Sequence, residues 1–299
     1  MIHIENLTKT YHKYKALDGL SLHAAKGSVY GLVGPNGAGK TTLIKQLAGV
    51  CRPDSGVIHI DGAPVYENPA VKSRLVYISD YPYFYPASTI RDMAKLYAGF
   101  YPSWSWDRFE SLQSTFGINP RCSFRRLSKG MQKQAVFWAG ISARPEVMIL
   151  DEPMDGLDPV VRRSVWKLLM QDVYDNKMTI LVSSHNLREL EDVCDHVGIL
   201  FNGKIVLEKS LDDTKGSIHK VQAAFSESFP PELERTLDIL HKEQFGTIWS
   251  LVVRGSSGEI RSVLTAHHPR VCDVLPLTLE EVFIYELGGM GYEIESIIL

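Results

Sequence analysis

The chain has 299 residues, a length that predicts about two domains. Hydrophobic residues make up 44% and charged residues 22%, which is typical of globular proteins and excludes a disordered chain. The formal net charge is −3 and no half of the chain is strongly basic, which argues against binding of nucleic acid through charge alone. No apolar run approaches the ~18–20 residues of a membrane-spanning helix, and four scattered cysteines without a CxxC pair exclude a disulfide scaffold or zinc module.

The first 66 residues favour short strands separated by glycine-containing turns. Within them, the apolar run at 29–33 predicts a strand that is buried on both faces. A region of about 85–145 follows that we expect to be helical, since Ile90, Met93 and Ala94 share one helical face with Tyr97.

Strand signals return after the helical region. Apolar runs at 147–150 and 179–182 flank a helical stretch at about 160–174. The dipeptide Asn202-Gly203 between apolar runs at 196–201 and 204–207 predicts a hairpin, because both turn residues must accept a positive φ. Strands that alternate with helices predict an α/β core with a largely parallel sheet.

The last 80 residues differ in charge, with 6 Lys or Arg against 12 Asp or Glu from position 220 onward. Strands are expected at 221–225, 247–253 and 271–277, with a helix at 231–243. We therefore predict a domain at 1–219 and a small C-terminal α+β accessory domain at 220–299.

A glycine-rich segment lies between the strand at 29–33 and a helical stretch at 41–48, and it matches G-x-x-x-x-G-K-[ST]. Its residues are Gly34, Pro35, Asn36, Gly37, Ala38, Gly39, Lys40, Thr41 and Thr42. Glycines allow backbone N–H groups to converge on phosphate oxygens at a helix N-terminus. The motif predicts that Lys40 contacts the β- and γ-phosphates of a nucleotide and that the Thr41 hydroxyl binds Mg²⁺. The order of strand, loop and helix disfavours the alternative, a glycine-rich turn without a ligand.

Two acidic residues follow the apolar run at 147–150. Asp151 and Glu152 would lie at the carboxyl end of a core strand, where ligands of α/β proteins bind. We expect Asp151 to hold Mg²⁺ through water and Glu152 to polarise the attacking water. Acids at the end of a buried strand are common, so this signal gains its weight from the phosphate loop beside it.

The third motif, Leu127-Ser128-Lys129-Gly130-Met131, opens a helical stretch 23 residues before Asp151, and its serine is a candidate N-cap at a possible phosphate site. In this order the three motifs resemble the nucleotide-binding domain of ATP-binding cassette (ABC) transporters, whose signature reads LSGGQ or LSxGM. The resemblance covers about residues 1–216. It implies a P-loop NTPase core with an antiparallel β subdomain and an inserted helical subdomain. It also implies that the signature contacts ATP held by a second subunit.

The resemblance implies roles for further positions. Tyr11 matches the aromatic residue that stacks on adenine, with Tyr14 as the alternative. Asp158 matches the position that communicates across the dimer, and His185 matches the switch histidine that contacts the γ-phosphate. Asp80 stands where the family usually has Gln and sometimes Glu, and we expect its carboxylate to bind Mg²⁺.

The segment 77–109 holds 11 of the 29 aromatic residues of the chain. Four of them are nearly consecutive, so no single face of a helix or strand could bury them all: Tyr81, Tyr83, Phe84 and Tyr85. The segment is either the core of the helical subdomain or a docking surface, and in the resembled family this region meets the membrane subunit.

The resemblance implies an ATP-hydrolysing subunit that powers a transporter, with permease subunits on separate chains and a location on the cytoplasmic side of the membrane. The LSxGM variant, Asp-Gly-Leu-Asp-Pro and the acidic tail resemble bacterial exporters of drugs, antibiotics or peptides. One alternative is a soluble ABC ATPase that acts on the ribosome or DNA, although only 88 residues separate Lys40 from Ser128 and leave no heptad insert. Another is a nucleotide sensor with little hydrolysis, which the intact Lys40, Glu152 and His185 disfavour.

Overall fold

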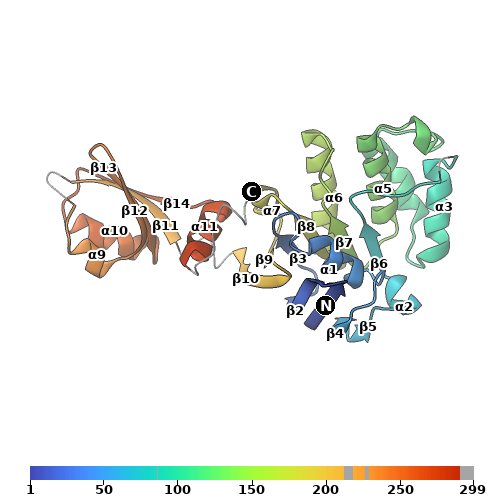
Figure 1. The fold of residues 1–299 in the computed structure, drawn as a ribbon. Helices are drawn as coiled ribbons and strands as arrows, with labels where there is room; N and C mark the ends of the chain where they lie inside the picture. The colour runs from blue at the N-terminus through green and yellow to red at the C-terminus, as the bar shows by residue number, and fades with distance from the viewer. Residues whose placement is uncertain (86, 212–217, 226–228, 290–299) are drawn as a thin grey trace. The chain divides into compact units, whose positions relative to one another are not determined.

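The computed structural model describes residues 1–85, 87–211, 218–225 and 229–289 (Figure 1). The chain forms two compact units, one of Met1–Asn186 with Val193–Glu208 and one of Leu187–Asp192 with Lys209–Leu299. A boundary between residues 219 and 220, at the change in charge, would cut strand β11 (Ile218–Ala224), so the division between the units lies earlier in the chain.

A six-stranded sheet forms the centre of the first unit. Its strands in spatial order are β10 (Lys204–Ser210), β9 (His196–Phe201), β3 (Val29–Val33), β8 (Thr179–Ser184), β7 (Val147–Asp151) and β6 (Leu75–Ile78). The pairs from β9 to β6 are parallel, and β3, β7 and β8 are buried along their whole length. The predicted α/β core with a largely parallel sheet is confirmed.

A second, antiparallel sheet packs in the same unit and shares one hydrophobic core with the phosphate-loop helix. Its strands in spatial order are β2 (Tyr14–Ala24), β1 (Ile2–Tyr11), β4 (Ser55–Ile60) and β5 (Ala63–Pro64), and the helices beside it are α1 (Lys40–Leu47) and α2 (Pro69–Lys72). This sheet is the predicted antiparallel β subdomain.

The helical region between β6 and β7 is confirmed, and Figure 1 shows α3 and α5 together at the β6 end of the central sheet. Its helices are α3 (Ile90–Phe100), α4 (Trp106–Phe116), the 3₁₀ turn η1 (Phe124–Arg126) and α5 (Lys129–Ser142). Side-chain oxygens of Thr89, Ser105 and Ser128 cap the three α-helices by accepting a backbone N–H three residues later.

Trp138 of α5 anchors this helical region. Its ring is fully buried, stacks on Phe109 at 4.5 Å between centroids, and donates its Nε1–H to the Phe109 carbonyl oxygen at 2.7 Å. We expect Trp138→Ala to lower the free energy of unfolding by about 3–5 kcal/mol, because it leaves a cavity and an unpaired carbonyl. Urea unfolding gives the measurement, and Phe100→Ala at an exposed position of α3 is the control. We expect the control to lower the free energy of unfolding by about 0.5 kcal/mol or less. A loss near that of the control would show that Trp138 is not an anchor.

Helix α6 (Pro159–Asn176) joins β7 to β8, as the sequence predicts. The predicted hairpin is also confirmed, since β9 and β10 are neighbours and the turn residues Asn202 and Gly203 have φ of 48° and 76°. In the part of the chain that the structure describes, no helix is both long and apolar enough to span a membrane.

The second unit contains a four-stranded antiparallel sheet. Its elements in chain order are α7 (Leu187–Leu190), β11 (Ile218–Ala224), α9 (Leu233–Thr236), β12 (Asp238–Phe245), β13 (Ile248–Arg254), α10 (Ser257–Thr265), β14 (Val271–Pro276) and α11 (Leu279–Gly289). The strand order β12-β13-β11-β14 with a βαββαβ sequence of elements is a ferredoxin-like arrangement.

One element of the second unit differs from the prediction. The expected helix at 231–243 is wrong, because only Leu233–Thr236 is helical and the chain then enters β12. Strand β12 pairs with β13 through a tight turn at Gly246, whose φ is 61°. Backbone pairing at this edge therefore overrides the local helical pattern.

Candidate functional site

Four loops leave the same edge of the central sheet, because β3, β8, β7 and β6 are neighbours and run parallel. The loop after β3 is the glycine-rich segment, while the residues at the ends of β7, β8 and β6 are Asp151 with Glu152, His185 and Asp80. A pocket of about 370 Å³ lies there, and its lining includes Lys40, Thr41, Asp80 and Glu152. The fold thus gathers residues from distant parts of the sequence into one site.

The glycine-rich loop needs its first and third glycines for steric reasons. A Cβ at Gly34 would lie 2.2 Å from the Leu200 carbonyl oxygen. Gly39 has a φ of 113°, and a Cβ there would lie 2.5 Å from the Ala16 carbonyl oxygen. Only glycine fits both positions, and the loop leads directly into α1, where backbone N–H groups can bind an anion.

Lys40 and His185 both contact the carboxylate of Glu152. The Lys40 ammonium lies 3.3 Å from Glu152 Oε1 and also donates to the Gly34 carbonyl oxygen at 2.5 Å. His185 Nδ1 lies 3.0 Å from Glu152 Oε2, and the His185 backbone N–H donates to the same oxygen at 3.3 Å. The structure therefore brings together the three residues that the sequence predicts to be catalytic.

Asp151 is almost fully buried at the end of β7, where two hydroxyl groups donate to it. Ser183 Oγ lies 2.8 Å and Thr41 Oγ1 lies 3.3 Å from Asp151 Oδ1. Burial raises the pKa of Asp151, and these two hydrogen bonds oppose that shift. A carboxylate beside a hydroxyl is the hard oxygen donor set that Mg²⁺ prefers, so the predicted ligands Thr41 and Asp151 fit this ion.

Tyr11 and Tyr14, the two candidates for adenine stacking, both line the pocket and are about half exposed. The Tyr14 hydroxyl donates to the Gly37 carbonyl oxygen at 3.1 Å, which ties this ring to the phosphate loop. Burial raises the pKa of Tyr11, whose ring lies below the Lys9 ammonium at 5.6 Å. Both rings remain candidates for the stacking role.

The signature segment 127–131 does not line this pocket in the part of the chain that the structure describes. Ser128 is the N-cap of α5, and a Cβ at Gly130 would lie 2.9 Å from the Gly156 carbonyl oxygen. Asp158 is the N-cap of α6, with its Oδ1 accepting from the N–H groups of residues 160 and 161 at 3.0 Å each. The segment therefore packs against the loop between β7 and α6.

Two residues of the site were missed by the sequence analysis. Ser183 couples both acids, since its hydroxyl donates to Asp151 and accepts from the Glu152 N–H at 3.1 Å. Lys133 of α5 is buried, and its ammonium lies 3.5 Å from Asp80 Oδ1. Asp80 and Lys133 belong to separate segments of the sequence, so no local pattern indicates this pair.

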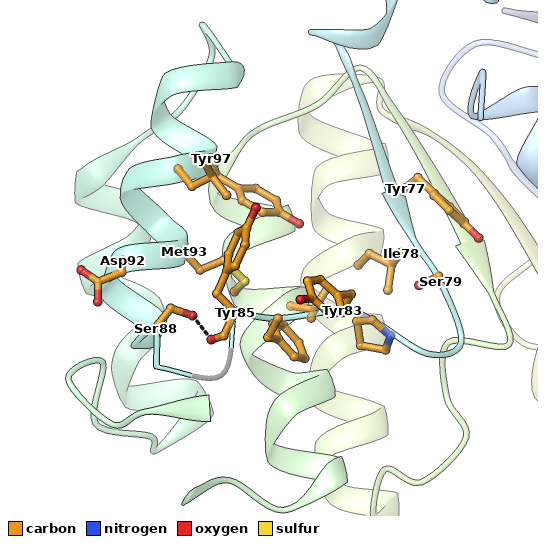
Figure 2. Close-up of a pocket in the computed structure, with 13 residues that line it drawn as sticks. Tyr77, Ile78, Ser79, Tyr83, Tyr85, Ser88, Asp92, Met93 and Tyr97 are labelled. Carbon is orange, nitrogen blue, oxygen red and sulfur yellow. Dashed lines mark hydrogen bonds between the residues drawn. The ribbon is translucent and has the colours of Figure 1, made fainter. Parts of the chain in front are cut away.

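A second pocket, of about 360 Å³, lies between α3 and the segment that follows β6 (Figure 2). Figure 2 shows Met93 and Tyr97 reaching toward it from α3, and Tyr83 and Tyr85 from the segment after β6. Tyr83 is 82% and Tyr85 66% exposed, whereas Phe84 stacks on a buried ring of η1. The aromatic segment therefore contributes both to the core and to the surface.

Comparisons with known proteins agree with this geometry. Residues 17–155 match the family model described as ABC transporter. The ABC transporter ATP-binding protein YtrB of Bacillus subtilis (strain 168) is 32% identical over 289 residues, which cover 97% of this chain and 99% of that protein. The bacitracin transport ATP-binding protein BcrA of Bacillus licheniformis is 29% identical and covers 97% of this chain and 98% of its own. A solved structure of an ATP binding subunit of an ABC transporter is 27% identical with a TM-score of 0.67, over 72% of this chain and 92% of that one.

Proposed function

This chain belongs to the ABC transporter family of ATP-binding proteins and is an ATPase, and we propose that it powers an exporter whose membrane-spanning subunits are separate chains. The observation that carries the proposal is the meeting of Lys40, Asp151, Glu152 and His185 at one edge of the sheet. Similarity to YtrB over 97% of the chain supports the same role for the whole molecule, including its second unit.

Binding of ATP requires positive charge and N–H donors at the phosphates. The Lys40 ammonium provides the charge and already lies among the carbonyl oxygens of its own loop, at Gly34 and Pro35. A phosphate oxygen can replace these two carbonyl oxygens as the acceptor without movement of the backbone, because the Lys40 side chain already lies over the glycine-rich loop. The rings of Tyr11 and Tyr14 are available for the base at the same pocket.

Hydrolysis requires a base beside the attacking water. Glu152 is suited to this role because its carboxylate is held by Lys40 on one oxygen and by His185 on the other. Lys40 leaves Glu152 when it engages phosphate, which frees Oε1 to accept a proton from water. His185 keeps the other oxygen in place and contacts the γ-phosphate from the same side.

We assign the metal role to Thr41, Asp151 and Asp80, whose oxygens line or border the same pocket. Mg²⁺, when bound, supplies positive charge against the negative phosphate oxygens. Ser183 keeps the Asp151 carboxylate oriented through its hydrogen bond, so this serine supports the same role.

The exposed tyrosines after β6 suit a docking surface for the permease, which would place this chain on the inner face of the membrane. We expect Tyr83→Ser with Tyr85→Ser to leave the ATPase rate of the isolated chain unchanged and to reduce co-purification with the permease at least about tenfold. The reason is that both rings are exposed beside an apolar pocket and would bury their surface against a partner.

The control for this double variant is Tyr174→Ser, which removes an equally exposed ring from α6, outside the pocket. The measurement is affinity purification after co-expression with a multi-span membrane protein taken from the genes that neighbour this one. Loss of the melting transition in the double variant would place both rings in the core and contradict the docking role.

For the cargo, we propose an amphipathic peptide or antibiotic, since a relative similar over 97% of the chain is named for bacitracin transport. The test is purification of the tagged chain from its native cells. We expect a multi-span membrane protein to accompany it and cells with Lys40→Met to become more sensitive to peptide antibiotics. Recovery with ribosomes or DNA, and no membrane protein, would instead favour a soluble ABC ATPase.

A further inference from the structure

Lys133 is a buried lysine that joins three segments of the first unit. It lies on the second turn of α5, and its side chain is 6% exposed. Its ammonium donates to the carbonyl oxygens of Glu152 at 2.8 Å and Asp155 at 2.9 Å, and it lies 3.5 Å from Asp80 Oδ1. Three acceptors thus match the three N–H donors of an ammonium group.

The peptide of Glu152 needs such support. Glu152 has a φ of 44°, in the left-handed region that a residue with a Cβ rarely adopts. A strained backbone persists only where surrounding contacts hold it. Here the N–H of Glu152 is held by Ser183 and its carbonyl oxygen by Lys133, one contact on each side of the strained residue.

Asp80 gives the ammonium its negative partner. Asp80 is one third exposed and lines the same pocket as Lys40 and Thr41. Without a cation beside it, its carboxylate would repel the phosphates of a nucleotide. Lys133 therefore has two separable effects: it holds the Glu152 carbonyl and it neutralises Asp80.

We propose that Lys133 is a positioning residue for hydrolysis, which fixes the strained Glu152 peptide through its carbonyl oxygen and offsets the charge of Asp80 at the nucleotide pocket. This proposal rests on the role of Glu152 in the proposed function. The Lys133 ammonium contacts Glu152, Asp155 and Asp80, and it acts on the nucleotide site through Glu152 and Asp80.

The test compares full-length Lys133→Met, Asp80→Asn and the double variant, with Lys167→Met on the exposed face of α6 as the control. Methionine keeps an unbranched side chain of nearly the same length and removes all three donors. Mant-ATP titration without Mg²⁺ gives the affinity free of any metal role of Asp80, Mg-ATP turnover gives kcat, and thermal melting reports folding.

We expect Lys133→Met to lower kcat on the order of 100-fold, because the carboxylate of Glu152 moves when its peptide relaxes. We also expect mant-ATP to bind about tenfold more weakly, because Asp80 is no longer neutralised. Adding Asp80→Asn should restore the affinity to within about threefold of wild type and leave kcat low. This selective rescue is something that a general loss of stability would not produce.

Two results would overturn the proposal: a folded Lys133→Met with wild-type kcat, or recovery of kcat in the double variant, which would mean that Lys133 acts by charge alone. If Lys133→Met does not fold, Lys133→Gln takes its place, since an amide still donates to one carbonyl but cannot neutralise Asp80. A Glu152→Gln variant with normal turnover would refute the proposed function, whereas normal turnover of Lys133→Met beside an inactive Glu152→Gln would refute only this inference.

Discussion

Replacement of Glu152 by Gln is expected to lower kcat for ATP hydrolysis by about 100- to 1,000-fold, with ATP binding retained. Glutamine has the same size, but its single amide oxygen can keep the contact with Lys40 or the contact with His185 and not both, because these two residues contact different oxygens of Glu152. It is a far weaker base, so the attacking water keeps its proton. Loss of a negative charge 3.3 Å from the Lys40 ammonium should also strengthen ATP binding slightly, because the lysine is freed for the phosphates.

Because the variant binds ATP without consuming it, we expect it to accumulate as an ATP-bound dimer. Single-turnover kinetics measure the chemical step, and light scattering with saturating Mg-ATP measures the oligomeric state. Glu110→Gln, an exposed position of α4 paired with Arg91, is the matched control. Normal hydrolysis by Glu152→Gln would assign the base to another residue, while a monomer in light scattering would speak against a homodimer.

The centre of the site could be predicted from the sequence because its parts are local motifs. The phosphate loop is one contiguous motif in the sequence, and the structure shows that its positions 34 and 39 require glycine for steric reasons. The acids at 151 and 152 end an apolar run, and parallel strands bring their carboxyl ends to one edge. In such cases the local pattern and the tertiary structure agree.

The contacts of Asp80 could not be predicted, because they depend on a residue far away in the sequence. The departure from glutamine predicts a metal ligand, and the structure adds a contact of the same carboxylate with Lys133 of α5. Only the packing of α5 against the loops after β6 and β7 brings the two charges together. A local motif describes the chemistry of one side chain but not the partner that neutralises it.

The secondary structure of the second unit was harder to predict for a different reason. The sequence pattern predicts a helix at 231–243. The structure ends that helix at Thr236 and pairs β12 with β13. Because most of β12 is exposed, its alternation carries little apolar signal, and pairing with β13 decides its conformation.

We expect the ATP site to be shared between two subunits, and this leads to the second large effect. Within one chain the signature segment does not line the nucleotide pocket among the described residues, so we expect it to act on the ATP of a second subunit. Lys40→Met should abolish ATP binding by its own chain. Ser128→Asp should block the partner's site, because aspartate still caps α5 but brings a negative charge to the γ-phosphate. Each variant alone should hydrolyse ATP at least about 100-fold more slowly than wild type.

A mixture of the two variants should regain activity if the sites are shared. In a heterodimer, Lys40 of the Ser128→Asp chain faces the intact Ser128 of the Lys40→Met chain, which rebuilds one complete site. Random pairing makes about half of the dimers mixed, so an equal mixture is expected to reach about a quarter of the wild-type rate. Ser128→Asn, which caps the helix without a charge, is the control and should stay active. If the mixture stays inactive although mixed dimers form, each site is complete within one chain, and the signature segment has no role in the partner's hydrolysis.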